Sequence, residues 1–305
     1  MNKYQITVSD DNENERIDRL VCDELADLSR SYIQKLIEGG NITVSGKIIK
    51  ASYRLKPGDE ITVITPDSII PDILPEDIPL DILYEDSDVL VVNKEKGMVV
   101  HPAPGHYEHT LVNAVMFHCR DNLSGINGVT RPGIVHRIDK DTTGSVLICK
   151  NDRAHENIAK QLEEHSIKRE YLAIVTGTLN DDAGTIDRPI GRSSSDRKKM
   201  AVIPGGKRAV THYEVVKRLS GYTVVRCRLE TGRTHQIRVH MASIGHPVAG
   251  DTVYGNGAKT PVDTCGQALH AHILGFVHPV SGVFIETVAP PPEYFDLFIE
   301  KCEKV

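Results

Sequence analysis

Asp139 lies in the segment of the chain that is richest in chemically useful side chains. Residues 131–144 read Arg-Pro-Gly-Ile-Val-His-Arg-Ile-Asp-Lys-Asp-Thr-Thr-Gly, and an apolar, strand-like run follows at 145–149. We expect a loop held by a rigid sheet, which is where reactive groups are commonly placed. A carboxylate in such a loop can attack or stabilise an electron-poor carbon. Asp141, in the same segment, is interpreted as a turn residue.

Standard motifs do not account for this segment. An EF-hand loop beginning at Asp139 needs glutamate at its twelfth position, where Lys150 stands. The chain has no complete Walker loop, no Gly-x-Ser-x-Gly elbow and no Gly-x-Gly-x-x-Gly after a strand. The closest histidine pairs are His270 with His272 and His235 with His240. No carboxylate completes a recognisable metal site around either pair, so we expect neither a metal nor a cofactor.

The net charge of -6 hides two basic segments. Residues 28–58 contain six basic side chains and one acidic, and residues 188–208 contain seven basic and one acidic. Residues 67–88, in contrast, contain eight acidic side chains and no basic one. Basic patches on an acidic chain fit phosphate contacts at defined places. Solvated loops would give the same pattern, and charge alone does not separate the two interpretations.

Composition favours an ordinary globular protein. Hydrophobic residues make up 40% of the 305 residues, and none of the six cysteines belongs to a Cys-x-x-Cys pair. No apolar run approaches the roughly 20 residues of a membrane helix. The first residues lack the apolar stretch of a signal peptide. We therefore expect a cytoplasmic protein with no membrane partner and, by default, a monomer.

The first part of the chain is predicted to form a small α+β domain. The expected elements are helices at 16–25 and 30–38 and strands at 42–44, 47–49 and 60–63. Residues 30–37 and 40–47 resemble an S4 RNA-binding module, which implies an S4-like domain over 13–73. In that family the second helix and the loop after it lie against structured RNA, so the contacts implied are Arg30, Lys35 and Lys47. The proline-rich, acidic stretch at about 65–80 is interpreted as a linker.

The remainder, residues 74–305, is predicted to be a second α+β domain. The expected strands are 88–92, 145–149, 171–175, 211–217, 222–229, 270–277 and 283–288, and the expected helices are about 110–118, 152–164, 234–244 and 292–302. Ser220-Gly221 and Ser281-Gly282 each join two of these strands as an antiparallel hairpin. Adjacent hairpins with interspersed helices indicate a mixed, largely antiparallel sheet.

Residues 136–144 follow the pattern His-Arg-Ile-Asp-x-x-Thr-x-Gly, which resembles the signature loop of the RluA/RluD family of pseudouridine synthases. Residues 168–173 (Lys-Arg-Glu-Tyr-Leu-Ala) and 232–240 (Gly-Arg-Thr-His-Gln-Ile-Arg-Val-His) are similar to that family's second and third motifs. The likeness continues at 246–255 and 269–271, and it is closest to the ribosomal, RluD-like branch. A minor departure is Ile138, where the family often has leucine.

This resemblance implies a pseudouridine synthase fold and an isomerase with Asp139 as the essential carboxylate. The reaction breaks the N1–C1′ bond of a uridine flipped out of folded RNA and joins C5 to C1′. The resemblance favours 23S, large-subunit ribosomal RNA as the substrate; transfer RNA, or a non-catalytic role in ribosome assembly, are the alternatives. Arg192 and Lys198, in the basic segment 188–208, are further expected RNA contacts.

A carboxylate in a pocket that excludes water needs a cation to stay ionised. On a helix over 234–244, Arg233 shares a face with Ile237 and Met241, whereas Arg238 lies roughly 140° away. We therefore assign the ion pair with Asp139 to Arg233, as the family's third motif also implies. Arg238 is left as a phosphate or structural contact.

The resemblance also implies roles for three residues around the carboxylate. Tyr171 matches the family's active-site tyrosine, whose ring can stack on the uracil. Arg137 is expected to fill the gap that the flipped nucleotide leaves, because base extrusion costs a few kcal/mol that new contacts must offset. His136 is interpreted either as an RNA contact or as a packing residue.

Overall fold

The computed structural model describes residues 2–25, 28–65, 73–102, 106–120, 122–126, 131–194, 196, 199–255, 257 and 259–303. The chain divides into two compact units, residues 1–70 and 71–305. Residues 66–72 of the predicted linker lie outside the described residues. Residues 73–80 are not a free linker, because Ile73 is buried and the Leu74 carbonyl accepts a hydrogen bond from Asn113 Nδ2 at 2.8 Å.

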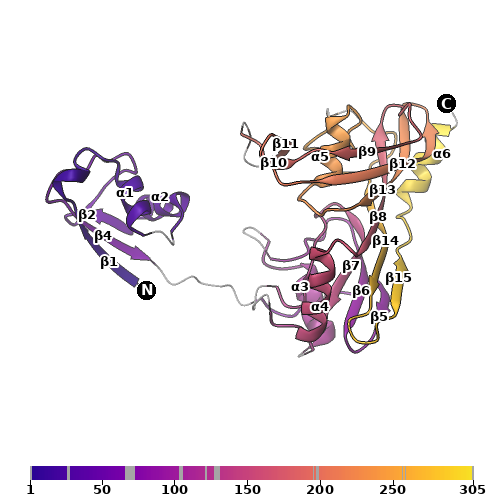
Figure 1. The fold of residues 1–305 in the computed structure, drawn as a ribbon, viewed down its shortest axis with the longest axis horizontal. Helices are drawn as coiled ribbons and strands as arrows, with labels where there is room; N and C mark the ends of the chain where they lie inside the picture. Colours follow the sequence, from indigo (N-terminus) through magenta and orange to yellow (C-terminus); the bar gives the residue numbers. More distant parts are fainter. Residues whose placement is uncertain are drawn as a thin grey trace. The chain divides into compact units, whose positions relative to one another are not determined.

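The N-terminal unit packs two helices on a four-stranded sheet (Figure 1). Its elements are β1 (Asn2–Thr7), the short 3-10 helix η1 (Asp10–Asn12), α1 (Ile17–Glu24), α2 (Arg30–Glu38), β2 (Ile42–Val44), β3 (Lys47–Ile48) and β4 (Glu60–Thr65). The predicted helices and the three predicted strands are confirmed. The edge strand β1, which pairs with β4, was not predicted, although its apolar residues Tyr4 and Ile6 alternate with polar ones.

Asp18 joins the two helices of this unit from a fully buried position. Its carboxylate accepts hydrogen bonds from Arg16 Nε at 2.9 Å, from Arg30 Nη2 at 3.0 Å and from Gln34 Nε2 at 2.8 Å. Burial alone would raise the pKa of Asp18, but the hydrogen bonds from Arg16, Gln34 and Arg30 outweigh it and lower the pKa to about 2. Arg30, predicted to contact RNA, therefore also ties α2 to α1.

Replacing Asp18 by asparagine is expected to destabilise this unit at neutral pH. It should also make the stability of the unit less dependent on pH in the acid range. A carboxyl group whose pKa falls on folding stabilises the fold above its unfolded pKa, and this contribution disappears as the pH falls from about 4 to about 2. The expected loss at pH 7 is roughly 2 kcal/mol. Hydrogen exchange of the α1 amides in the full chain measures it. Asp23→Asn, an exposed site on the same helix, is the control, and equal losses for both variants would contradict the assignment.

The C-terminal unit is built on one large sheet with the strand order β5-β6-β7-β14-β8-β13-β12-β9, to which β15 adds by pairing with β14. The strands are β5 (Ile82–Glu85), β6 (Val89–Lys94), β7 (Thr143–Cys149), β8 (Lys168–Thr176), β9 (Ala183–Asp187), β12 (Val210–Leu219), β13 (Tyr222–Leu229), β14 (Leu269–Val277) and β15 (Phe284–Val288). β7 and β14 run parallel, and the other paired strands of this sheet run antiparallel. The sheet is thus mixed and largely antiparallel, as predicted.

Helices cover both faces of this sheet. They are α3 (Leu111–Cys119), α4 (Asp152–Glu163), α5 (Gln236–Ser243) and α6 (Tyr294–Glu303). Successive residues of a strand face opposite sides: in β6, Leu90 packs in the cluster that contains α3, whereas Val91 packs in the cluster that contains α4. The central strands are therefore buried on both faces and hold the segments between them rigidly.

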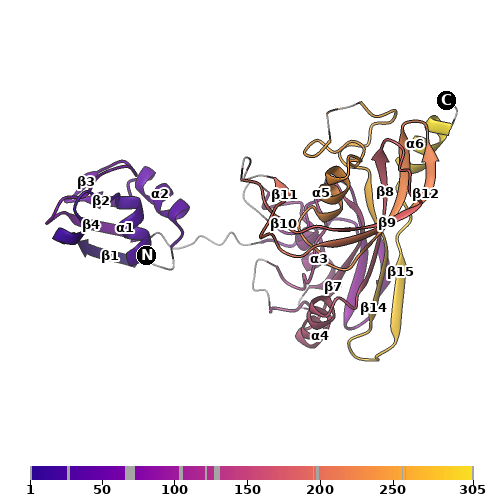
Figure 2. The same ribbon diagram turned by 45° about the horizontal axis from the view of Figure 1, so that its top comes forward.

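The basic segment 188–208 contains a hairpin and is not simply a loop. β10 (Ile190–Arg192) pairs with β11 (Met200–Val202), and Figures 1 and 2 show this hairpin beside α5. These two strands have three residues each, which is too short to show an apolar alternation, so the sequence did not indicate them. None of the helices in the described part of the chain is long and apolar enough to cross a membrane.

Candidate active site

Asp139 lies on the loop that enters β7, and several backbone contacts fix this loop. The Asp139 carbonyl accepts a hydrogen bond from the Thr142 N–H at 3.1 Å. The next carbonyl, that of Lys140, accepts from Gly97 N at 3.1 Å and from Lys94 Nζ at 3.0 Å. Lys94 is buried, which lowers its pKa to about 7, and it donates to the carbonyls of Glu95 and Met98 as well. The reactive carboxylate therefore starts from a backbone that can move little.

Gly144 explains why the loop motif ends in glycine. Its φ is +108°, and a Cβ built on it would lie 2.2 Å from the Ala271 carbonyl oxygen of the adjacent parallel strand. Any side chain at this position would push β7 away from β14. The glycine thus allows the close strand pairing directly behind the Asp139 loop.

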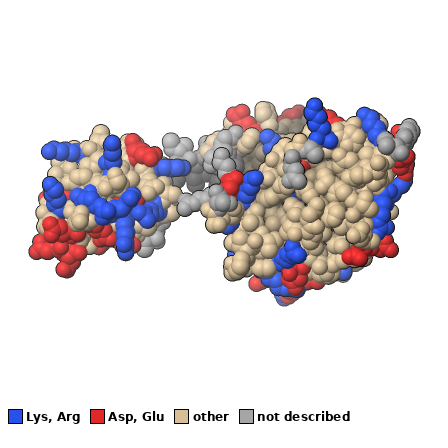
Figure 3. All heavy atoms as spheres, turned by 90° about the horizontal axis from the view of Figure 1, so that it is seen from above, with Lys and Arg blue, Asp and Glu red and all other residues tan. Residues whose placement is uncertain are grey.

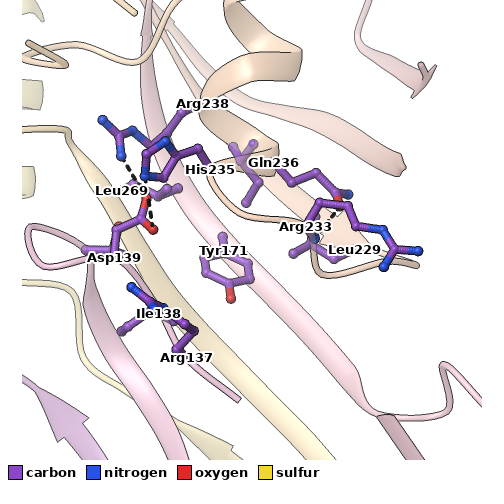
Figure 4. A pocket seen from close by; sticks show the side chains of 12 residues that line it. Arg137, Ile138, Asp139, Tyr171, Leu229, Arg233, His235, Gln236, Arg238 and Leu269 are labelled. Atoms are coloured by element: carbon purple, nitrogen blue, oxygen red, sulfur yellow. Dashed lines mark hydrogen bonds and ion pairs between the residues drawn. The ribbon is translucent and has the colours of Figure 1, made fainter. Parts of the chain in front are cut away.

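The counter-ion of Asp139 is Arg238, in the first turn of α5 (Figure 4). Arg238 Nη1 donates to Asp139 Oδ2 at 2.8 Å, while its Nε and Nη2 donate to the two oxygens of Asp251 at 2.7 and 2.9 Å. The Asp251 side chain is fully buried, and it also accepts from the Val253 and Tyr254 N–H groups. This bidentate contact with Asp251 fixes the orientation of the guanidinium. Its Nη1 atom is therefore held toward Asp139.

Electrostatics keep this cluster charged despite its burial. Burial by itself would lower the pKa of Arg238, but hydrogen bonding and charge from Asp251 and Asp139 raise it well above the ordinary value. Burial would likewise raise the pKa of Asp251, yet Arg238 and the two backbone donors hold it below the ordinary value. Two carboxylates around one guanidinium leave a net charge of about -1 at the site.

The predicted ion pair between Asp139 and Arg233 is therefore wrong. α5 begins at Gln236, and His235 before it has a left-handed backbone with φ +57°. Arg233 thus lies outside the helix on which its direction had been projected. Its Nε donates to the Arg208 carbonyl at 2.9 Å, and Figure 4 shows the side chain directed away from Asp139.

The prediction that this helix is amphipathic, with one buried and one exposed face, was also wrong. Gln236 to Met241 are all buried, so α5 has no solvent face in its first two turns, and angular position could not separate the two arginines. Arg238, with a side chain only 5% exposed, is a structural and electrostatic partner and does not face solvent as a phosphate contact would.

His235 and Tyr254 form a second line of contacts that sequence reasoning did not single out. His235 Nδ1 lies 2.8 Å from the Tyr254 hydroxyl, and that hydroxyl accepts the Met200 N–H at 2.9 Å. The hydroxyl therefore connects His235 to β11, and the other ring nitrogen, Nε2, lies 3.7 Å from Asp139 Oδ1. Burial lowers the pKa of His235, so the ring is neutral near pH 7. His235 lies in the motif at 232–240, and Asp251 and Tyr254 lie in the similar stretch at 246–255, so the family resemblance could have pointed to all three residues.

These residues line a pocket of about 360 Å³, including the part open to solvent. Its lining includes Arg137, Asp139, Tyr171, Arg233 and Arg238. Asp139 Oδ1 receives no hydrogen bond from the described residues, so one carboxylate oxygen faces the pocket without a bonded partner there.

The sequence of the chain matches two known protein families. The RNA pseudouridylate synthase family matches residues 88–243, and the S4 domain family matches residues 15–61. An uncharacterized RNA pseudouridine synthase of Bacillus subtilis is 52% identical over 100% of this chain and 99% of its own length. This chain belongs to the RNA pseudouridylate synthase family.

Other members of the family give the same result. The chain is 45% identical to ribosomal large subunit pseudouridine synthase D of Zymomonas mobilis, over 97% of this chain and 96% of that protein. Among solved structures, human RNA pseudouridylate synthase domain containing 1 is 26% identical, with a TM-score of 0.57, over 70% of this chain and 84% of that one. The chain is thus an isomerase that converts uridine to pseudouridine in RNA, with an S4 RNA-binding domain at its N-terminus.

The three other residues predicted near Asp139 have different surroundings in this synthase. Tyr171, on β8, lines the pocket with Asp139, and burial raises its pKa, so its hydroxyl is protonated. Arg137 is exposed at the pocket and donates from Nη1 to His101 Nε2 at 3.0 Å. His136 accepts the Leu147 N–H at 2.9 Å, and burial lowers its pKa to about 4, which fits the packing alternative.

The predicted RNA contacts outside the pocket are on the surface of the synthase where they are described. Arg30, Lys35 and Lys47 are exposed on the N-terminal unit, and Arg192 is exposed on β10. Lys198 lies outside the described residues.

Proposed function

We propose that this synthase isomerises specific uridines of large-subunit ribosomal RNA, with Asp139 as the catalytic carboxylate acting on a base flipped out of the helix. The substrate class is supported by relatives named ribosomal large subunit pseudouridine synthase D in Zymomonas mobilis and Vibrio cholerae, 45% and 43% identical to this chain. The observation that carries the catalytic assignment is the ion pair between Asp139 and the clamped Arg238 at the pocket.

The reaction needs an ionised carboxylate but no redox partner. The N1–C1′ bond breaks, the uracil turns, and C5 bonds to C1′; the proton leaves C5 and N1 gains one, so the atoms balance without a cofactor. Asp139 Oδ2 is held by Arg238, and Oδ1 is the oxygen that meets the electron-poor ribose. Because Arg238 is oriented beforehand by Asp251, the charge is in place before the substrate arrives.

Base flipping gives Tyr171 and Arg137 their roles. A uridine inside a helix cannot reach Asp139, so it must leave the stack, at a cost of about a few kcal/mol. The Tyr171 ring, on the rigid strand β8, is placed to stack on the extruded uracil. The exposed Arg137, at the same pocket, is placed to occupy the space the base leaves.

The N-terminal unit is proposed to hold the ribosomal RNA through phosphate contacts. Lys and Arg side chains gather over the face of this unit that Figure 3 shows. The exposed basic residues of the unit include Arg30, Lys35, Lys47, Lys50 and Arg54. Binding through such contacts releases counter-ions and should weaken steeply with salt.

Mapping pseudouridine in total RNA from a strain that lacks this gene is expected to show the loss of one or a few sites in large-subunit ribosomal RNA. Expressing the wild-type chain should restore those sites, and expressing Asp139→Asn should not. The measurement is reverse-transcription mapping before and after complementation. Loss of sites only in transfer RNA would replace the proposed substrate, and an unchanged map would remove it.

A further inference from the structure

A second cavity adjoins the active-site pocket. It shares four lining residues with that pocket: Arg137, Tyr171, Leu229 and Arg233. We call it the flanking cavity; its other lining residues are Val135, His136, Leu162, Glu163, His165, Arg169 and Gly232. Its volume is about 1280 Å³, including the part open to solvent. The two hollows therefore lie side by side along these four residues.

The charged residues that line the flanking cavity are mostly cations. Arg137 comes from the loop before β7, Arg169 from β8, and Arg233 from the segment before α5. Against these three arginines stands one acidic lining residue, Glu163. Three separate segments of the chain thus bring positive charge to one hollow, which is an arrangement that attracts an anion.

Arg169 is the least satisfied of these cations. It is only 8% exposed, and none of the described carboxylates forms an ion pair with it. Its Nη2 donates to the Glu230 carbonyl at 3.2 Å, whereas its buried Nε has no hydrogen-bond partner among the described residues. Such a donor is rare in folded proteins and calls for a specific explanation.

Burial without a paired carboxylate is costly for a guanidinium. It lowers the pKa of Arg169 below the ordinary arginine value, although the group stays charged at neutral pH. The Glu230 side chain cannot compensate, because it is paired with Arg208 and His212. A bound anion would supply both the missing acceptor and the missing charge.

The position of Arg169 defines where that anion would lie. Arg169 and Tyr171 are two residues apart on β8, so their side chains share one face of the strand, about 7 Å apart along it. Gly232 keeps the approach open, since a Cβ there would lie 2.6 Å from Arg169 Nη1. The separation suits a base on Tyr171 and a phosphate of the same nucleotide or its neighbour on Arg169.

We propose that the flanking cavity is a phosphodiester site for the RNA strand next to the target uridine, and that Arg169 is the residue that holds the phosphate. This site rests on the proposed function only in that a uridine occupies the adjoining pocket. Arg137 and Arg233, at the boundary of the two cavities, complete the positive surface around it.

Binding of uridine, uridine 5′-monophosphate and uridine 3′-monophosphate to the full chain at fixed low salt tests this site. For the wild type, one of the two monophosphates is expected to bind roughly 10- to 100-fold more tightly than uridine, as a charge-assisted contact provides. In Arg169→Gln that advantage should disappear while uridine affinity is unchanged. Arg169→Lys, which keeps the charge but loses the planar fork, should retain part of it.

Arg226→Gln is the matched control, because Arg226 lies on the neighbouring strand β13 and lines neither cavity. It should keep the full phosphate advantage. The site is disproved if neither monophosphate binds the wild type better than uridine, or if Arg169→Gln weakens uridine and monophosphate equally, which would indicate a structural role. Failure of the proposed function is a separate result, since an unchanged RNA map would leave these affinity ratios as they are.

Discussion

Asp139→Asn is expected to lower the kcat/KM for pseudouridine formation by at least about 10³-fold, a loss typical of removing a group that acts on the reacting atoms. Asparagine has nearly the same shape and can still accept the hydrogen bond from Arg238 Nη1. It cannot supply an anionic oxygen to the ribose. RNA affinity should change little, because the surfaces proposed to bind phosphate lie elsewhere.

A single-turnover assay on the mapped ribosomal RNA fragment, together with a binding measurement, separates these two effects. Asp141→Asn removes the same charge from the same loop, but Asp141 lines a different cavity, beside Lys94 and Lys96. It should keep most of the activity. Retention of more than about a tenth of the wild-type rate by purified Asp139→Asn would remove the carboxylate from the mechanism.

The second large effect is expected from Arg238→Gln. This substitution leaves Asp139 and the fully buried Asp251 without their cation. Breaking a buried pair by removing one partner typically costs about 3–5 kcal/mol of stability. Activity should fall at least about 100-fold, because Asp139 then loses the guanidinium that orients it and balances its charge. Denaturant unfolding and single-turnover rates measure the two losses.

Arg233→Gln is the comparison that distinguishes the two arginines of the third motif. Its guanidinium contacts the Arg208 carbonyl and no carboxylate among the described residues, so stability should change by less than about 1 kcal/mol. Its expected effect is on RNA affinity, with a smaller salt dependence of binding. If Arg233→Gln proves as destabilising as Arg238→Gln, the observed pairing does not describe the protein in solution.

Local patterns in the sequence were sufficient for most of the architecture. The sequence placed α1, α2, α3 and α4 to within about one residue, and in α1, α2 and α4 the apolar spacing reflects burial of one side. In α3, by contrast, the residues from Leu111 to Val115 are all buried. Glycine-containing turns identified both hairpins, β12–β13 and β14–β15. The strands that were missed are β1, β5, β9, β10 and β11; each has at most six residues, so it offers few positions from which a burial pattern can be read.

The sequence by itself determined the family, the α+β class and the loop that carries Asp139, because these depend on ordered motifs and on periodic burial. Only the tertiary structure decided which arginine faces Asp139. α5 is buried on every side, and its start depends on the left-handed His235, so helix geometry could not orient the arginines. The roles of Asp251 and of the unpaired Arg169 likewise arise from contacts between distant segments, which spacing along a chain does not encode.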